Sequence, residues 1–180
     1  AIVDSRYEEP LNVYGYSKLL FDQHVRRILP QTRTPVVGLR YFNVFGAREE
    51  HKKHMKSVVS HFHQALLDQG EISIYTAPEV APGEQARDFM YVKDAVEVNL
   101  WCLQNSIASG IYNCGSGNAL TFNQVAQVLI DHVREGRISY QAMPEKLRYA
   151  YQFFTQADMQ PLRKQGYIKP FTALADALQD

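Results

Sequence analysis

Residues 35–46, PVVGLRYFNVFG, form a nearly continuous apolar run that ends at a glycine. A run without polar alternation predicts a β-strand buried on both faces, which is typical of a parallel sheet. A helix is predicted directly upstream, beginning after Asn12 and ending at Pro30, because proline cannot continue a helix. This part of the chain therefore indicates the end of a doubly wound α/β domain.

Helical and extended patterns alternate through the rest of the chain, and no internal repeat is present. Apolar residues spaced three and four apart from Met55 to Leu66 predict an amphipathic helix that Gly70 closes. Asp94 and Thr121 are expected to cap two further helices, and the Thr155 to Asp158 spacing is expected to start a short one. Further strands are predicted at ISIY, RDFMYV, GIYN and RISYQA, with a short helix at the C-terminus. The order of these elements predicts an α/β fold.

The composition is that of an ordinary globular protein, with 46% apolar residues and 19 basic against 19 acidic residues. This balance gives no reason to expect nucleic acid or an anionic membrane surface as a partner. No apolar run is long enough to cross a bilayer, and the first residues do not have the layout of a signal peptide. We therefore expect a cytoplasmic protein in which Cys102 and Cys114 are reduced and buried.

The pattern YxxxK occurs once near the start, at Tyr14 and Lys18, which lie one turn apart on the predicted helix. A nearby ammonium stabilises a phenolate, so Lys18 could help Tyr14 to act as a base. Tyr16 has Leu20 at the same offset and is expected only to pack. The alternative for Tyr14 and Lys18 is an exposed pair without a chemical role, and the pattern alone does not decide between them.

Four histidines lie between residues 51 and 63, but their spacing matches no familiar set of metal ligands. We therefore predict no metal site. The glycine-rich segment CGSGNAL has Leu120 where a third glycine of a phosphate-binding loop would be needed, so it is interpreted as a turn.

Four longer segments carry a resemblance to a known family: PLNVYGYSKLLFDQHVRRILP, VVGLRYFNVFGAREEHK, RDFMYVKDAVEVNLW and GIYNCGSG. In this order and spacing they resemble the extended short-chain dehydrogenase/reductase family. The resemblance covers essentially the whole chain but only the C-terminal portion of the family's usual length. It implies an incomplete NAD(P)-binding Rossmann domain, which lacks its leading strands and GxGxxG loop, together with a small α/β substrate-binding domain. The expected Rossmann part comprises residues 1–45, 91–117 and 151–173, and the substrate-binding part comprises residues 46–90, 118–150 and 174–180.

Two further segments, REEHKKHM and PEKLRYAYQFFTQADM, narrow the resemblance within this family. Together they imply an NADP-dependent epimerase that oxidises and re-reduces C6 of an ADP-heptose for lipopolysaccharide core synthesis, and that forms a homo-oligomer. Inversion at a carbon needs proton-transfer groups on both of its sides. The family's two groups match Tyr14 and Lys52, and desolvation near a cationic cofactor ring would favour the neutral amine of Lys52. The matching cofactor-binding residues are Tyr14, Lys18, Val44 and Lys52. Without the resemblance, EEHKKH would be interpreted as a solvated run of charges.

The resemblance also implies a set of substrate-binding residues: Asn43, His54, His61, Tyr75, Arg87 and Tyr151. Arg87 would hold the nucleotide diphosphate with its forked, permanently charged guanidinium, and the alternative is a structural pair with Asp88. His54 stands where the family has a serine, and the loop after Tyr75 is longer than usual. The chain opens without Met in a predicted loop, so we expect it to be the C-terminal part of a longer protein. Two other functions stay open: another nucleotide-sugar epimerase or dehydratase of this fold, and a non-catalytic fragment.

Overall fold

The computed structural model describes residues 8–180, and they form an α/β fold built on short, mainly parallel sheets. The elements follow one another in this order: α1 (Val13–Ile28), η2 (Leu29–Gln31), β1 (Val37–Tyr41), β2 (Asn43–Phe45), η3 (Glu50–Met55), α2 (Val58–Gln69), β3 (Glu71–Thr76), β4 (Ala86–Tyr91), α3 (Val92–Gln104), β5 (Gly110–Cys114), β6 (Ala119–Thr121), α4 (Phe122–Val133), β7 (Arg137–Ala142), α5 (Glu145–Arg148), α6 (Gln160–Lys164) and α7 (Leu174–Ala177). The α/β prediction is therefore confirmed.

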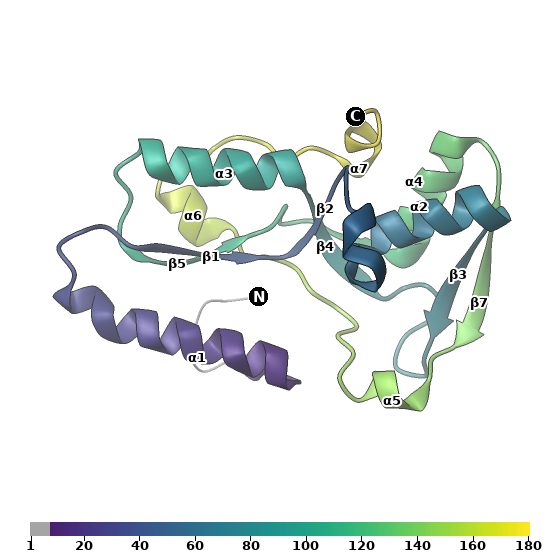
Figure 1. Ribbon diagram of the computed structural model, residues 1–180, viewed down its shortest axis with the longest axis horizontal. Helices are drawn as coiled ribbons and strands as arrows, with labels where there is room; N and C mark the ends of the chain where they lie inside the picture. The colour runs from purple at the N-terminus through teal and green to yellow at the C-terminus, as the bar shows by residue number, and fades with distance from the viewer. Residues whose placement is uncertain (1–7) are drawn as a thin grey trace.

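Parallel pairing joins β1 to β5, β2 to β4, and β3 to β7, while β6 runs antiparallel to β4. Figure 1 shows α1 and α3 on opposite sides of the β1 and β5 pair, with α2, α4, β3 and β7 gathered at the other end of the molecule. Among residues 8–180, none of the helices combines the length and the apolar character that a bilayer crossing requires.

The apolar run at residues 35–46 is less buried than its sequence predicts. It divides into β1 and β2 at Phe42, whose N–H donates to the carbonyl of Cys114 at 3.0 Å. All of β1 is only partly buried or exposed, and Phe45 is the one buried residue of β2. The expectation of burial on both faces was therefore wrong for β1, which among the described residues also has a neighbouring strand on one side only.

Several local predictions are confirmed and three are wrong. Gly70, at a φ of 66°, ends α2, and Thr121 forms a capping box with Gln124 at the start of α4. Met55 does not belong to α2, because it lies in η3 with its side chain 75% exposed. Asp94 does not cap α3, because its carboxylate accepts hydrogen bonds from Thr172 instead. The Thr155 to Asp158 pattern does not start a helix, since α6 begins only at Gln160.

Two clusters of buried side chains form separate cores. The first core comprises Phe45, Val59, Phe62, Leu66, Ile72, Ile74, Phe89, Tyr91, Phe122, Val125, Ala126, Leu129, Leu174 and Ala177. The second core comprises Met90, Ala95, Val98, Ile107, Tyr112, Cys114, Ala157, Met159, Leu162 and Tyr167. The expected division into a Rossmann part and a substrate-binding part stays a prediction. Except for Phe45 and Tyr91, the residues of the first core lie in the expected substrate-binding part. Except for Met90, those of the second core lie in the expected Rossmann part.

The two cysteines carry free thiols. Cys114 is fully buried in the second core, and burial raises the pKa of its thiol to about 12. Cys102 is half-buried, so the expectation of burial holds fully for Cys114 only.

β4 separates the two cores and is buried along its whole length. Because successive side chains of a strand point to opposite faces, Phe89 and Tyr91 enter the first core while Met90 enters the second. The carboxylate of Asp88 is completely buried and accepts hydrogen bonds from the N–H groups of Ser116, Gly117 and Ala157 at 2.7–2.9 Å, and from the Ser116 hydroxyl at 2.6 Å. One side chain therefore joins β4 to the turn after β5 and to the segment before α6.

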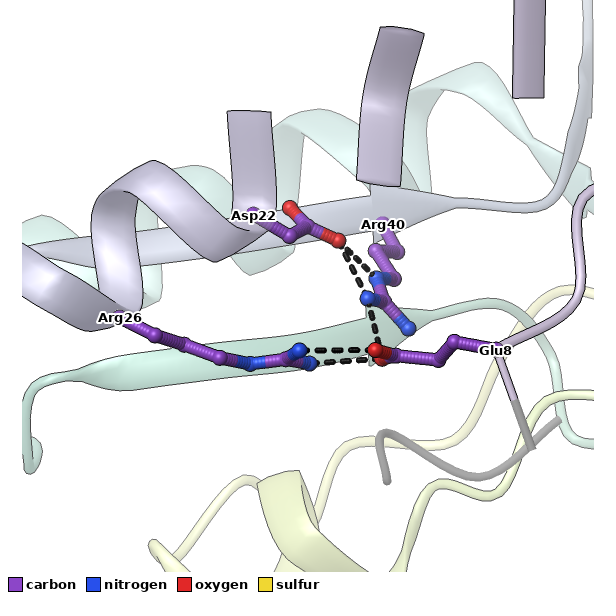
Figure 2. A network of polar contacts seen from close by, with 4 residues as sticks. All are labelled: Glu8, Asp22, Arg26 and Arg40. Atoms are coloured by element: carbon purple, nitrogen blue, oxygen red, sulfur yellow. Dashed lines mark hydrogen bonds and ion pairs between the residues drawn. The ribbon is translucent and has the colours of Figure 1, made fainter. Parts of the chain in front are cut away.

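A network of two acidic and two basic side chains attaches α1 to β1 (Figure 2). The carboxylate of Glu8, whose side chain is 7% exposed, accepts two bonds from Arg26 at 2.7 and 2.6 Å and one from Arg40 at 2.5 Å. Arg40, on β1, also donates to Asp22 on α1. The hydrogen bond from Arg26 is the largest influence that holds the pKa of Glu8 below its usual value; Arg40 adds to it and burial opposes it.

We expect Glu8→Gln to loosen α1 selectively. The two guanidinium groups are still partly solvated, so the loss of local stability should be about 1–2 kcal/mol. Faster hydrogen exchange of the α1 amides, with unchanged exchange in β4, would show this effect. Because the folded-state pKa of Glu8 is depressed, the same stabilisation should be present at neutral pH and lost as the pH falls through that depressed value. The control is Glu71→Gln, which removes an ion pair with Arg137 elsewhere; equal α1 exchange in both variants would contradict the role of Glu8.

We expect Asp88→Asn to destabilise the whole fold by about 2–4 kcal/mol, because an amide group would face backbone N–H donors that need an acceptor. Urea denaturation followed by circular dichroism measures this loss. The matched control is Asp131→Asn on α4, where an exposed carboxylate accepts a bond from Gln127. The control should cost less than about 0.5 kcal/mol, as surface substitutions usually do. Similar denaturation midpoints for the two variants would show that the Asp88 contacts do not stabilise the fold.

Candidate active site

Tyr14 and Lys18 lie on the first turns of α1, as the sequence predicts. The helix starts there because the Asn12 side chain accepts a hydrogen bond from the Gly15 N–H at 2.8 Å. The ammonium of Lys18 lies 5.0 Å from the centre of the Tyr14 ring, and the Tyr14 side chain is 72% exposed. Tyr16 is also more than half exposed, so the expectation that it packs against neighbours was wrong. The helix thus presents a phenol and an ammonium side by side on an open surface.

Lys52 lies in the loop of residues 46–57, which connects β2 to α2 through η3. Its ammonium is 3.3 Å from a carboxylate oxygen of Glu49, and its side chain is 44% exposed. Lys52 is therefore solvated in the described chain, and its desolvation beside a cofactor ring stays a prediction. The interpretation of EEHKKH as a purely solvated run was wrong, because Glu49 is 4% exposed.

His54 and His61 come together beside Lys52. A ring nitrogen of His61, on α2, lies 3.2 Å from the backbone carbonyl of His54. Both side chains are exposed. The two predicted contact residues thus share one surface, but they are linked through a backbone group and not through the imidazole of His54.

Asn43 and Val44 lie on β2, between the two cores. The Asn43 side-chain amide is 3.4 Å from the carbonyl of Asp88 on β4, and Val44 packs against the second core. Both are partly buried, so a strand and not a flexible turn fixes the position of the Asn43 side chain.

Arg87 and Tyr151 form the most buried part of the site. The Arg87 guanidinium lies 5.1 Å from the centre of the Tyr151 ring and donates to the carbonyl of Ala86 at 3.1 Å. Arg87 is only 9% exposed, and burial lowers the pKa of its guanidinium below its usual range. The alternative of a pair with Asp88 is wrong, because the Asp88 carboxylate is occupied by Ser116, Gly117 and Ala157.

In the part of the chain that the structure describes, Arg87 has no carboxylate partner. A guanidinium remains charged even when buried. Taking a charge out of water is costly unless an opposite charge approaches it. Arg87 is therefore a candidate site for an anion.

Backbone pairing explains how Tyr151 reaches Arg87 from far along the chain. The Ala86 N–H donates to the carbonyl of Phe153, and the Thr155 N–H donates to the carbonyl of Ala86. Burial raises the pKa of the Tyr151 phenol, while Arg87 acts in the opposite direction. Tyr151 is therefore a neutral ring that packs against the cation.

Tyr75 joins this group through a residue that sequence reasoning missed. The Gln85 side chain is 1% exposed and donates to the carbonyl of Tyr75 at 2.8 Å. Nothing in the sequence marks Gln85, since it lies in a loop that has the composition of a surface turn. Glu49 was missed in the same way, within a run of charged residues.

The predicted residues thus form three groups: Tyr14 and Lys18 on α1, Lys52 with His54 and His61, and Tyr75 with Arg87 and Tyr151. Across residues 8–180, no hydrogen bond or ion pair connects Tyr14 or Lys18 with the other two groups. The same residues contain no cluster of three or more His, Cys, Asp or Glu side chains that could hold a metal ion.

The segment CGSGNAL is a turn, as the sequence predicts. Gly117 has a φ of 77°, and a side chain at Gly115 would clash with Ala157 and Asp88. The N–H groups of Ser116 and Gly117 are already bonded to Asp88, so they are not available to a phosphate. For a nicotinamide cofactor, suitable groups lie on α1 instead, where the exposed Tyr14 hydroxyl and Lys18 ammonium could bond to a ribose.

Comparison with known proteins gives one matching family and several similar proteins. The pattern of the NAD dependent epimerase/dehydratase family matches residues 2–115. A curated ADP-L-glycero-D-manno-heptose-6-epimerase from Alkalilimnicola ehrlichii is 51% identical over 161 residues, which is 89% of this chain and 50% of that protein. The chain therefore spans about half the length of this curated relative.

Solved structures agree in fold. The crystal structure of Helicobacter pylori ADP-L-glycero-D-manno-heptose-6-epimerase has a TM-score of 0.83 and 30% identity, covering 100% of this chain and 52% of that one. UDP-glucose 4-epimerase of Thermus thermophilus in complex with NAD has a TM-score of 0.77 and 22% identity, covering 99% of this chain and 56% of that one, so it supports the fold alone. With the family pattern covering well over half of its residues and a relative of 51% identity, this chain belongs to the NAD dependent epimerase/dehydratase family.

Proposed function

We propose that this chain provides the substrate-binding and proton-transfer groups of an NADP-dependent ADP-glyceromanno-heptose 6-epimerase, which interconverts the D-glycero and L-glycero epimers of the ADP-heptose for lipopolysaccharide core synthesis. The observation that carries the proposal is Arg87, a buried guanidinium without a carboxylate partner among the described residues. A cytoplasmic location and a homo-oligomeric assembly stay predictions.

Arg87 suits the diphosphate of an ADP-sugar for two reasons. Its fork of N–H donors can bond to two phosphate oxygens at once, and its burial makes an anionic ligand more favourable than water. Tyr151 holds the guanidinium plane from one side, at 5.1 Å from ring centre to carbon. Tyr75, Asn43, His54 and His61 would contact the remainder of the substrate.

Tyr14 and Lys52 are the proposed proton-transfer groups for the two sides of C6. Each has an exposed functional group, and they lie on different elements, α1 and η3. Lys18 would stabilise the Tyr14 phenolate from one helical turn away. A nicotinamide cofactor, when bound, would supply hydride uptake and return, and the residues proposed to hold it are Tyr14, Lys18, Val44 and Lys52.

A non-catalytic fragment is the second candidate function, and one observation favours it. On α1, Val13 is 85% exposed, Phe21 65% and Leu20 48%, so much of this helix has no covering partner in the described chain. A related epimerase or dehydratase with another nucleotide-sugar substrate is the third candidate. The experiments below separate these candidates.

The catalytic proposal can be tested in a chimera that joins this chain to the N-terminal half of the Alkalilimnicola relative. Tyr14→Phe and Lys52→Met should each lower epimerisation by about 100-fold or more, because each removes one proton-transfer group. Turnover is measured by NMR of the two ADP-heptose epimers. The matched controls are Tyr16→Phe and Lys53→Met, which should retain the rate of the unmodified chimera. Normal rates in both test variants would refute the two-group assignment, and an inactive unmodified chimera would favour the fragment or another substrate.

The role of Arg87 can be tested on the chain itself with ADP as the probe. Arg87→Lys should weaken ADP binding by about 10-fold or more, because lysine keeps the charge but loses the paired donors. Isothermal titration calorimetry gives the affinity. Arg137→Lys is the control, since Arg137 is an exposed arginine on β7 that pairs with Glu71. If both substitutions leave the ADP affinity unchanged, Arg87 does not hold the diphosphate.

A further inference from the structure

Glu49 is the one buried charge in a loop of exposed charges. Residues 47–55 are otherwise exposed, whereas the Glu49 side chain is 5% exposed. A buried carboxylate is stable only if hydrogen bonds replace the water that it loses. The contacts of Glu49 therefore indicate what its burial achieves.

The Glu49 carboxylate makes four contacts at the two ends of the loop and at its centre. It accepts from the Gly46 N–H at 3.3 Å, from the Ser57 N–H at 2.8 Å and from the Ser57 hydroxyl at 2.7 Å. Its fourth contact is the Lys52 ammonium at 3.3 Å. One side chain thus closes the loop between β2 and α2 and also fixes the direction of Lys52.

The backbone of this loop is held in an unfavourable conformation. Arg48 and Lys53 have φ values of 66° and 53°, in the left-handed region that residues other than glycine rarely adopt. Such conformations persist only where surrounding contacts enforce them. The bonds from Glu49 span both positions, since they connect residues 46, 52 and 57.

We propose that Glu49 is a positioning residue that holds the loop of residues 46–57 and orients the Lys52 side chain for proton transfer. This inference rests on the proposed function, in which Lys52 serves one side of C6.

The proton balance closes over one turnover. With a nicotinamide cofactor bound to accept and return the hydride, one of the two groups, Tyr14 or Lys52, would take the proton of the C6 hydroxyl, and the other would give a proton to the carbonyl oxygen on the opposite face. Water would then exchange protons with both groups and restore their starting states. Both side chains are open to water, since Tyr14 is 72% and Lys52 is 44% exposed.

The coupling between Glu49 and Lys52 can be measured in this chain without any turnover. Hydrogen bonds from Ser57, Lys52 and Gly46 hold the pKa of Glu49 below its usual value, although burial, the largest single influence, acts in the opposite direction. Removing Lys52 takes away one of the groups that lower this pKa. Lys52→Met should therefore move the Glu49 titration, followed by carbon-13 NMR of the side-chain carboxyl, to higher pH.

Lys53→Met is the matched control, because Lys53 is the adjacent exposed lysine and does not bond to Glu49. It should leave the Glu49 titration unchanged. The other titratable groups on this loop and at the start of α2 are Arg48, Glu50, His51, His54, Lys56 and His61, and they are the same in every variant.

An unchanged Glu49 titration in Lys52→Met would overturn the inference. Both lysine variants change exposed side chains, so neither substitution should prevent folding. The outcome is also separate from that of the catalytic proposal. If the titration shifts as expected but Lys52→Met retains full activity in the chimera, the coupling is correct and the catalytic role of Lys52 is wrong.

Discussion

The arrangement of the site depends on the buried carboxylate of Asp88. Its bonds to Ser116, Gly117 and Ala157 connect three segments that are far apart in sequence, and none of these bonds can be exchanged for water. The segment fixed at Ala157 is the same one that pairs with β4 at Ala86 and that carries Tyr151. The Asp88 contacts thus act together with the Ala86 pairing to hold the segment that carries Tyr151 beside Arg87.

The position of β4 between the two cores explains how a charged side chain comes to be buried. Arg87 follows the same alternation as Phe89 and Tyr91, so it points toward the side of the first core. The strand cannot turn Arg87 outward without also exposing both aromatic residues, and burial of each contributes about 1.5–3 kcal/mol. The packing of the strand thus holds the cation in a place where solvent cannot satisfy it.

Local features of the fold could be predicted from sequence because they depend on neighbouring residues. The Asn12 and Thr121 caps, the αL residue Gly70 and the spacing of Tyr14 and Lys18 are all of this kind. Glu49, Gln85 and Asp88 were missed as organising residues because a sequence pattern does not mark a buried polar group. Asp94 illustrates the same limit: it has the sequence of a helix cap, but its partner, Thr172, lies 78 residues away.

The Asp88 contacts also determine which groups are left to recognise an anion. Turns rich in glycine bind phosphates through free backbone N–H groups, and the turn at residues 115–118 contains two glycines. Its N–H groups at Ser116 and Gly117, however, already bond to a carboxylate, which repels phosphate. The fold therefore uses its glycine turn for internal structure and leaves a side chain, Arg87, as a buried cation that has no carboxylate partner within residues 8–180. A diphosphate is matched to that arrangement because the forked guanidinium, unlike a ring of N–H groups, brings a full positive charge.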